Sequence, residues 1–355
     1  PDEGTSVEEE TPELACFVRT ATGTGAIDDG TRWLAGMHAT PLAAAAPLSP
    51  SATGARPQYQ QWLAMDVAQR AAAMWQADTR SAAPAQAAGS PGSQRLFAGL
   101  WYANGSSPGE VVVQRRSALR MAKDAPAMPR AALLAVLHAL CESPAPLAAS
   151  RGVHVLLMMH HVEGLQPGLY LLARDEADLE HLVRFARGSM LVDLRSAAAA
   201  DPELARGLIA LGAKGCSVLA LAAPLDVRQA AQLSACNQEV AGEGALAAAF
   251  VGRFHGWRHP HEYLELLWEA GALGQALYLA AQAAGLGATG IGCFFDDFTL
   301  GLLRDTGGID AGSSAAQTFD PEGARYQVLY HFGVGRAVAD PRLLSFSPYH
   351  HLDKA

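Results

Sequence analysis

The sequence predicts a domain that mixes α-helices and β-strands, of either the α/β or the α+β class. Short apolar runs bounded by turn residues alternate with longer segments whose apolar residues recur at helical spacing. A late and mostly apolar run, Tyr326–Val334, is typical of a central strand. Half of the 355 residues are apolar and 17% are charged, so the chain can bury a sizeable core. The alternation by itself leaves both classes open.

The first 95 residues are expected to be organised differently from the rest. Residues 1–20 contain the apolar run Leu14–Val18, which is typical of a strand, and the chain starts with Pro1, so we expect a fragment or a processed product. Residues 21–95 are rich in Ala, Pro and Gly and are predicted to be a linker with one helix at 59–78. The compact domain is predicted to span residues 96–355.

The elements of the compact domain follow from turn signals and apolar periodicity. Proline in the first turn supports the first helix, and a Pro-Gly turn separates the first two strands. The longest helix ends at Gly285, where a C′ glycine belongs, and its predicted buried stripe is Leu266, Ala270, Leu273, Leu277 and Ala280. The predicted ranges are Pro129–Leu140, Val153–Met159, Leu169–Leu172, Asp175–Arg187, Ser217–Ala222, Asp226–Cys236, Ala247–Val251, Tyr263–Ala284, Ile291–Phe295, Phe298–Leu303 with Asp297 as its cap, and Tyr326–Val334.

The segment Gly285–Gly290, GLGATG, fits the dinucleotide fingerprint G-x-G-x-x-G in the wrong context. That fingerprint needs a strand before it and a helix after it, so that a pyrophosphate meets the helix N-terminus. Here a helix comes first and an apolar run, Ile291–Phe295, follows. A glycine-rich strand packed under a flat group is the better interpretation.

Charge and composition argue against several classes of function. The net charge of −9 and the lack of a basic run argue against a nucleic-acid partner. No apolar stretch reaches the roughly 18 to 20 residues of a membrane span. The five cysteines, at positions 16, 141, 216, 236 and 293, contain no C-x-x-C pair, which predicts free thiols in a reducing cytoplasm and no metal cage. The His160–His161 pair should point its rings to opposite faces, and His255, His259 and His261 favour a plain polar loop.

Six segments occur in a recognisable order across about residues 110–350. They are QRRSAL at Gln114–Leu119, VEGLQPGLYLL at Val162–Leu172, CNQEVAGEGA at Cys236–Ala245, WEAGALGQALY at Trp268–Tyr278, GLGATGIGCFFDD at Gly285–Asp297, and LYHFGVGR at Leu329–Arg336. In this order they resemble the nitroreductase-like FMN-dependent family, most closely its SagB-type dehydrogenase branch. The resemblance implies the α+β class: a nitroreductase-like mixed, largely antiparallel sheet flanked by helices. It also implies that residues 1–20 could be the tail of a preceding copy in a tandem chain.

The resemblance implies FMN as cofactor and assigns residues to it. Arg115, Arg116 and Ser117 match the family's phosphate and ribityl contacts, and fixed guanidinium groups suit a phosphate. Gly290, Ile291, Gly292 and Cys293 match the segment beside the flavin ring, where glycine allows close approach. Cys293 is expected to be a small buried residue. Arg336 and Arg342, after the closing strand, are the candidates that complete the phosphate site.

The sequence also departs from the family. Between Ser143 and Val153 it has no Asn or Gln to hold the edge of the flavin ring, and no Lys-Tyr pair lies near Trp257–Arg258. An azoline-oxidase mechanism is therefore not supported. Because family flavin sites lie between two subunits, a partner could supply the missing groups. We therefore expect a homodimer, or pairing with a related domain, through the small residues of the longest helix: Ala270, Gly271, Gly274 and Ala281.

Two functions remain open at this point. The first is an FMN-dependent oxidoreductase that transfers hydride between the flavin and an unidentified organic substrate, either a small molecule or a modified peptide. The second is a catalytically degenerate half that completes a site on another domain of the same kind. The R-R-S and G-I-G elements favour the first function, and the missing ring-edge element favours the second.

Overall fold

The computed structural model describes residues 106–141, 152–186, 191–198, 201–221, 226–253, 261–304, 326–344 and 346. All of them belong to the second of the two units into which the chain divides, Ser81–Ala355. The expected strand in residues 1–20, the helix at 59–78, the domain start near Leu96, and the loop histidines His255 and His259 lie outside the described residues.

Seven strands in the described residues form one sheet, in the order β3-β4-β2-β1-β5-β7-β6. Every neighbouring pair runs antiparallel. The strands are β1 (Val153–Met159), β2 (Gly168–Ala173), β3 (Leu191–Asp193), β4 (Ser217–Leu221), β5 (Leu246–Arg253), β6 (Gly287–Ile291) and β7 (Tyr326–Gly335).

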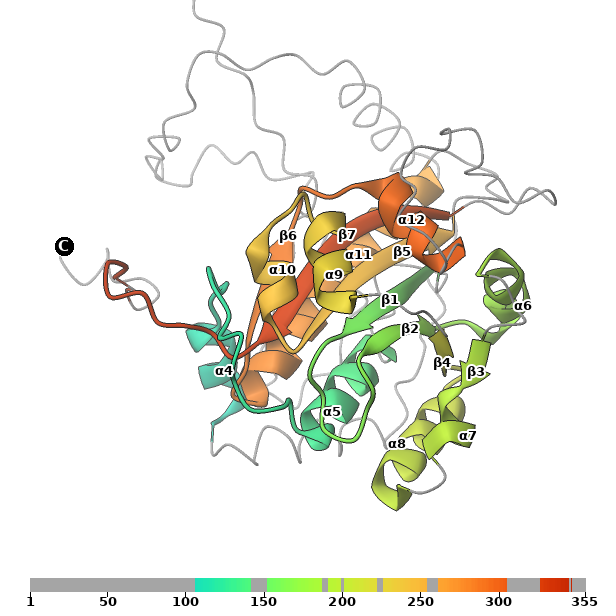
Figure 1. Cartoon of the computed structure of the whole chain (residues 1–355), viewed down its shortest axis with the longest axis horizontal. Helices are drawn as coiled ribbons and strands as arrows, with labels where there is room; N and C mark the ends of the chain where they lie inside the picture. The colour runs from blue at the N-terminus through green and yellow to red at the C-terminus, as the bar shows by residue number, and fades with distance from the viewer. Residues whose placement is uncertain are drawn as a thin grey trace, which may run out of the picture. The chain divides into compact units, whose positions relative to one another are not determined.

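Helices cover both faces of this sheet, as Figure 1 shows. Because strands β1 and β5 are buried on both faces, they read as continuous apolar runs. One core lies under α5, α8 and α11, and a second lies under α6, α9 and α12. The helices are α4 (Pro108–Gln114), α5 (Arg130–Cys141), α6 (Glu176–Phe185), α7 (Leu194–Ala197), α8 (Pro202–Gly212), α9 (Val227–Ser234), α10 (Glu239–Glu243), α11 (His261–Ala283) and α12 (Asp296–Arg304). The α+β class and the largely antiparallel sheet are thus confirmed.

Most predicted elements are confirmed, and two details near the glycine-rich segment are wrong. The strand there is Gly287–Ile291, not Ile291–Phe295, because the glycine-rich run pairs with β7 and Phe295 is left 55% exposed. Asp297 does not cap α12, since the helix already includes Asp296. Both carboxylates lie in the first turn, where the helix dipole favours negative charge. Gly285 has a φ of 70°, as a C′ glycine requires.

Helix α11 buries the predicted stripe but is not buried all round. Leu266, Ala270, Leu273, Leu277 and Ala280 are all buried. A Cβ added at Gly274 would meet the ring of Phe332 at 2.7 Å, so this glycine packs inside its own domain. A Cβ added at Gly271 would meet nothing within 4 Å, and this residue is exposed. Only Gly271 of the two can face another molecule, which corrects the expectation for Gly274.

A buried ion pair links the sheet to α11. The guanidinium of Arg174 pairs with the carboxylate of Glu269, and the backbone N–H of Gly152 donates to the other oxygen of that carboxylate at 3.0 Å. Burial raises the pKa of Glu269, against the opposing effect of the nearby Arg174 charge. The glutamate of the W-E-A-G segment therefore holds the fold together and faces no open site.

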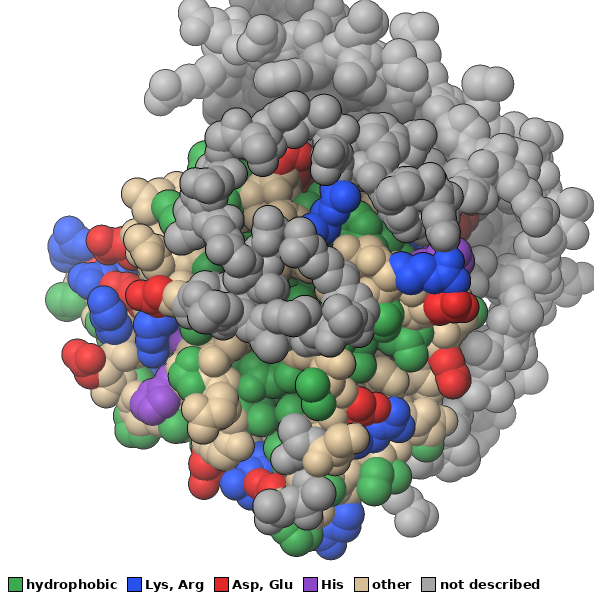
Figure 2. All heavy atoms as spheres, turned by 45° about the vertical axis from the view of Figure 1, so that its right-hand side comes forward, with side chains coloured by type: hydrophobic (Ala, Val, Ile, Leu, Met, Phe, Trp, Pro, Cys, Tyr) green, Lys and Arg blue, Asp and Glu red, His purple; other side chains and the backbone are tan. Residues whose placement is uncertain are grey.

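The surface mixes apolar and charged side chains. Figure 2 shows apolar side chains gathered in the middle of one face, with Lys, Arg, Asp and Glu side chains toward its edges. Val192 of β3 and Ile209 of α8 are among the exposed apolar residues of the described chain. No helix in the described ranges is both long enough and apolar enough to cross a membrane.

Candidate functional site

Helix α4 is followed directly by the R-R-S segment, which lies at the edge of the sheet. Ser107 and Glu110 form a capping box, and Pro108 occupies the first turn, so the helix has a defined start. The helix ends at Gln114, and the chain then becomes extended. Ser117 forms a parallel bridge with Ala288 of β6, and the N–H of Ala118 donates to the carbonyl of Ala288 at 2.9 Å. The first motif therefore lies directly beside the glycine-rich strand.

Tyr278 of α11 joins the two motifs. Its hydroxyl accepts a hydrogen bond from the backbone N–H of Gly290 at 2.8 Å, and it lies 2.8 Å from the hydroxyl of Ser117. The guanidinium of Arg115 stacks over the Tyr278 ring, 4.5 Å from its centre. Three predicted site residues, Arg115, Ser117 and Gly290, thus meet around one side chain that the sequence analysis did not single out. Its position at the end of the W-E-A-G segment was the available signal.

The two glycines of the G-I-G element have different surroundings. A Cβ at Gly290 would come within 2.7 Å of the Tyr330 hydroxyl, so this glycine is required by packing inside the chain. A Cβ at Gly292 would make only ordinary contact, 3.8 Å from the Tyr330 ring, and Gly292 is exposed. Ile291, between them, is buried against Ala235 and Ala241. Open space for a flat ligand is therefore present at Gly292 and absent at Gly290.

The predicted arginines differ in the hydrogen bonds and ion pairs that they already form within the chain. Arg116 donates to the carbonyls of Val113, Arg115 and Phe346, the last at 2.9 Å. Arg342 is paired with Asp340 two residues away, so its charge is locally balanced. Among the described residues, no carboxylate pairs with Arg115 or Arg336. Of the predicted arginines, Arg115 and Arg336 are therefore the ones most available to an anion.

Cys293 is exposed, which overturns the expectation that it is a buried core residue. It follows β6 where the chain leaves the sheet, and its carbonyl accepts a hydrogen bond from the Gln238 side chain at 3.2 Å. The sequence placed it in an apolar run, but that run does not form a strand. Its backbone is instead held by the turn between α9 and α10.

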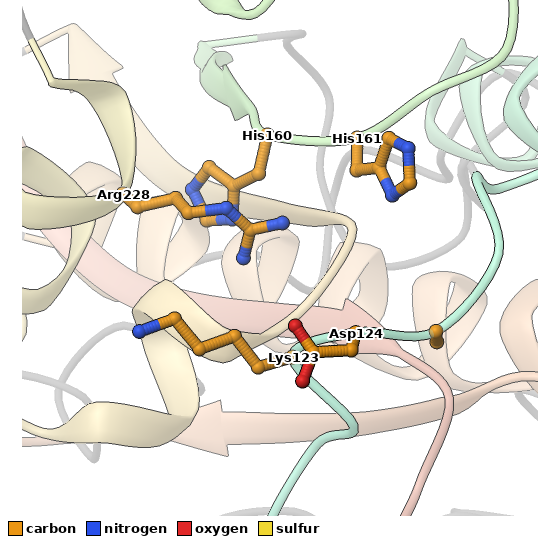
Figure 3. Close-up of a pocket in the computed structure, with 6 residues that line it drawn as sticks. Lys123, Asp124, His160, His161 and Arg228 are labelled. Carbon is orange, nitrogen blue, oxygen red and sulfur yellow. The ribbon is translucent and has the colours of Figure 1, made fainter.

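A separate cavity of about 430 Å³, wide open to solvent, lies near the end of β1 (Figure 3). His160 is buried there while His161 is exposed, as expected for adjacent residues at a strand end. Burial lowers the pKa of His160 to about 4, so its ring is neutral at pH 7. Arg228 donates to the carbonyl of Gly242 at 2.7 Å, which fixes its guanidinium at the cavity wall. The lining residues are Lys123, Asp124, Ala125, His160, His161 and Arg228.

No group of three or more metal-ligating side chains occurs within the described ranges. The pair His154 and Asp178, 2.9 Å apart, is fully buried and structural. Burial is the largest single influence on the pKa of each of the two groups. It lowers the pKa of His154. In Asp178 burial raises the pKa of the carboxyl, but the hydrogen bonds from His154 and Tyr326 and the Arg253 charge together outweigh it, so that this pKa is lowered. Residues 143–152, where the sequence has no Asn or Gln for the edge of a flavin ring, lie almost entirely outside the described residues.

Comparisons with known proteins complete the picture. No curated protein matches the sequence. A crystal structure of a presumed nitroreductase from Anabaena variabilis matches with 18% identity and a TM-score of 0.44, over 67% of this chain and 39% of that one. A presumed nitroreductase from Ralstonia eutropha matches with 16% identity and a TM-score of 0.39, over 66% and 85% of the two chains. An FMN-bound nitroreductase from Bacteroides fragilis matches with 13% identity and a TM-score of 0.31, over 69% and 97%.

The family model gives the assignment. The model described as "Nitroreductase family" matches residues 112–336, which is more than half of the chain. The match begins at Val112 within α4, includes the R-R-S segment, the sheet and the glycine-rich strand, and ends at Arg336. The chain belongs to the nitroreductase family.

Proposed function

We propose that this chain is an FMN-dependent oxidoreductase of the SagB-type dehydrogenase branch. The observation that carries the proposal is the meeting of Arg115, Ser117 and Gly290 around the Tyr278 hydroxyl. When bound, FMN supplies the redox chemistry by accepting and giving up a hydride. The chain's own residues then have three tasks: to bind the phosphate, to support the ring, and to admit the substrate.

The residues present fit these tasks. Arg115 is half-buried, is stacked on an aromatic ring, and has no described carboxylate competing for its charge, so it can serve a phosphate. The Ser117 hydroxyl, 2.8 Å from the Tyr278 hydroxyl, is a second donor. The exposed backbone at Gly292 leaves room for a planar ring without a Cβ in the way. We propose Arg336, exposed just after β7, as a further phosphate contact.

We propose an organic substrate, with a modified peptide as the class that the resemblance to the SagB-type branch suggests. The motif that carries this suggestion, Val162–Leu172, crosses the turn between β1 and β2. Two cationic side chains, Lys123 and Arg228, and a single carboxylate, Asp124, line the neighbouring cavity of about 430 Å³. A substrate that carries a carboxylate would suit this balance of charge.

A second candidate function rests on one observation. The Gly290 N–H, a donor that could face a flavin ring, is already satisfied by the Tyr278 hydroxyl. A domain whose ring-facing donor is occupied could serve as the structural partner of another nitroreductase-like domain. In that case FMN binding would require the two domains together.

Absorption spectroscopy and FMN titration of the purified chain test the proposal. We expect flavin bands that stay with the protein through gel filtration. Arg115→Ala should weaken FMN binding by about ten- to a hundredfold, or about 1.5–3 kcal/mol, through loss of a charge-assisted contact. Arg184→Ala is the matched control, because Arg184 forms an exposed ion pair with Glu180 on α6. A chain that binds no FMN alone but does so with a related domain would support the second function instead.

A further inference from the structure

Two cysteines that lie far apart in the sequence come together beside the glycine-rich strand. Cys236 lies in the turn between α9 and α10, and Cys293 follows β6. The backbone N–H of Phe295 donates to the carbonyl of Ser234 at 2.8 Å. The Gln238 side chain donates to the carbonyl of Cys293 at 3.2 Å. These bonds bracket Cys236 on both sides and hold its turn against Cys293.

Apolar packing next to the two cysteines also holds their two segments together. Ala235, next to Cys236, is buried together with Ile291, two residues before Cys293. The interaction of the Cys236 thiol with the Cys293 thiol raises the pKa of Cys236. The two segments are therefore held together by a main-chain hydrogen bond, by the Gln238 side chain and by an apolar contact.

The backbone at Cys236 is unusual. Cys236 has a φ of 52° and Asn237 a φ of 60°, so two residues that are not glycine adopt the left-handed conformation in succession. Asparagine tolerates this region, but cysteine rarely occupies it, and such strain persists only where the surroundings impose it. The Gln232 side chain donates to the Asn237 side chain at 3.1 Å and helps to hold the turn. The surroundings therefore hold the left-handed turn at Cys236 in place.

The thiols of Cys236 and Cys293 are more exposed to solvent than those of the other described cysteines. Cys293 is exposed and Cys236 is half-buried. Cys141 and Cys216 are 0% and 1% exposed. A reagent in solution therefore reaches Cys293 first and Cys236 second, and the remaining described thiols are protected.

We propose that Cys236 and Cys293 form a redox-active dithiol, which closes to an intrachain disulfide by exchange with a low-molecular-weight disulfide. The Cys293 thiolate attacks one sulfur of the small disulfide, forms a mixed disulfide and releases one thiol. The Cys236 thiolate then attacks the Cys293 sulfur, closes the protein disulfide and releases the second thiol. The protein loses two electrons and two protons, and the small disulfide is reduced to two thiols. The proposal is independent of flavin binding.

Incubation of the full chain with glutathione disulfide tests the proposal. We expect free thiols to fall by two, with a peptide map that links Cys236 to Cys293, and dithiothreitol should restore both thiols. Cys236→Ser should stop at a mixed disulfide on Cys293, with the mass gain of one glutathionyl group. Cys293→Ser should react far more slowly than the wild type, and Cys216→Ser is the matched control that should behave as wild type.

Three results would overturn the proposal. One is a wild-type chain that keeps all its thiols. Another is a stable glutathionyl adduct at Cys293 with Cys236 still free. The third is a bond that joins either cysteine to Cys141 or Cys216 instead. Circular dichroism of each serine variant establishes that the fold is intact, and Ala variants at the same positions replace any that does not fold.

Discussion

The hydroxyl of Tyr278 lies 2.8 Å from the backbone nitrogen of Gly290 and 2.8 Å from the hydroxyl of Ser117. One side chain of α11 thus ties the glycine-rich strand to the R-R-S segment. Its ring also packs edge-on against Phe332 of β7, with ring centres 5.0 Å apart. The candidate site is therefore anchored to the core through Tyr278.

Tyr278→Phe tests this anchor. The change keeps the ring and its contact with Phe332 but leaves the partly buried Gly290 N–H without its acceptor. We expect a loss of about 1 kcal/mol in the free energy of unfolding, at the low end for a donor left without its partner. FMN binding should weaken as well, because Ser117 loses its fixed position.

Urea unfolding and FMN titration measure both effects. Tyr170→Phe is the control, since the Tyr170 hydroxyl donates to the carbonyl of Gln166 at 2.7 Å, on a different part of the sheet. An equal loss of FMN affinity in both variants would show that Tyr278 has no special role at the site.

The G-I-G element offers a matched pair of substitutions. Gly290→Val should destabilise the fold, because a Cβ there already comes within 2.7 Å of Tyr330, and overpacking of this kind typically costs about 1–3 kcal/mol. Gly292→Val should leave stability nearly unchanged, because its Cβ meets only an ordinary contact. We expect Gly292→Val to abolish FMN binding if the ring lies there. Thermal unfolding and flavin absorbance distinguish the two, and a Gly292→Val chain that retains FMN would place the ring elsewhere.

Two buried histidines predict how stability depends on pH. Burial lowers the pKa of His160 and of His331 from 6.5 to about 4. Between these values the unfolded chain binds protons that the folded chain does not, so stability falls as the pH drops from 6.5 toward 4. Each histidine contributes at most about 1.4 kcal/mol per pH unit.

Urea titrations at several pH values across this window measure the slope. His331→Gln should reduce the slope by about one proton, because Gln does not titrate. The variant's own stability at pH 7 serves as the reference, since His331 also contacts Thr299 and stacks on Phe294. An unchanged slope would mean that His331 takes up a proton in the folded chain.

Local patterns were enough to predict much of the fold. β1 was predicted at its observed bounds, because it is an almost continuous apolar run, interrupted only by His154, as expected for a strand buried on both faces. The stripe of α11 was also correct, since a helix of this length repeats its pattern many times. The short elements β3, α7 and α10 were not predicted, because three to five residues carry too little periodicity. The helices α4 and α8 were not predicted either, although they have seven and eleven residues.

The glycine-rich segment shows where local reasoning fails. Glycine has low strand propensity, so the predicted strand was placed after it, at the apolar residues. Pairing with β7 overrides that preference and leaves Cys293 and Phe295 outside the sheet. The role of Tyr278 and the approach of Cys236 to Cys293 depend on contacts between distant segments, which no local pattern reports.

The exposed face of α11 leads to the last prediction, which concerns assembly. Leu267, Gly271 and Gln275 recur every four residues and are all exposed. Val112 and Val113 of the neighbouring helix α4 are 54% and 48% exposed. Leu267, Val112 and Val113 are exposed apolar side chains, and we expect them to favour a contact with a second copy or a related domain, which could supply the ring-edge groups that the sequence lacks.

Gly271→Glu should break this contact, because it buries an unpaired charge in the interface while leaving the fold intact. Gly274→Glu is the matched comparison on the same helix. There the new side chain would collide with Phe332 inside the domain, so the chain itself should unfold. Sedimentation should therefore show a smaller particle for Gly271→Glu, with unchanged thermal stability and weaker FMN binding. Thermal unfolding of Gly274→Glu should instead show a lower midpoint. A wild-type chain that sediments as a monomer with FMN bound would remove the basis for an interface on α11, and the exposed row would then be ordinary surface.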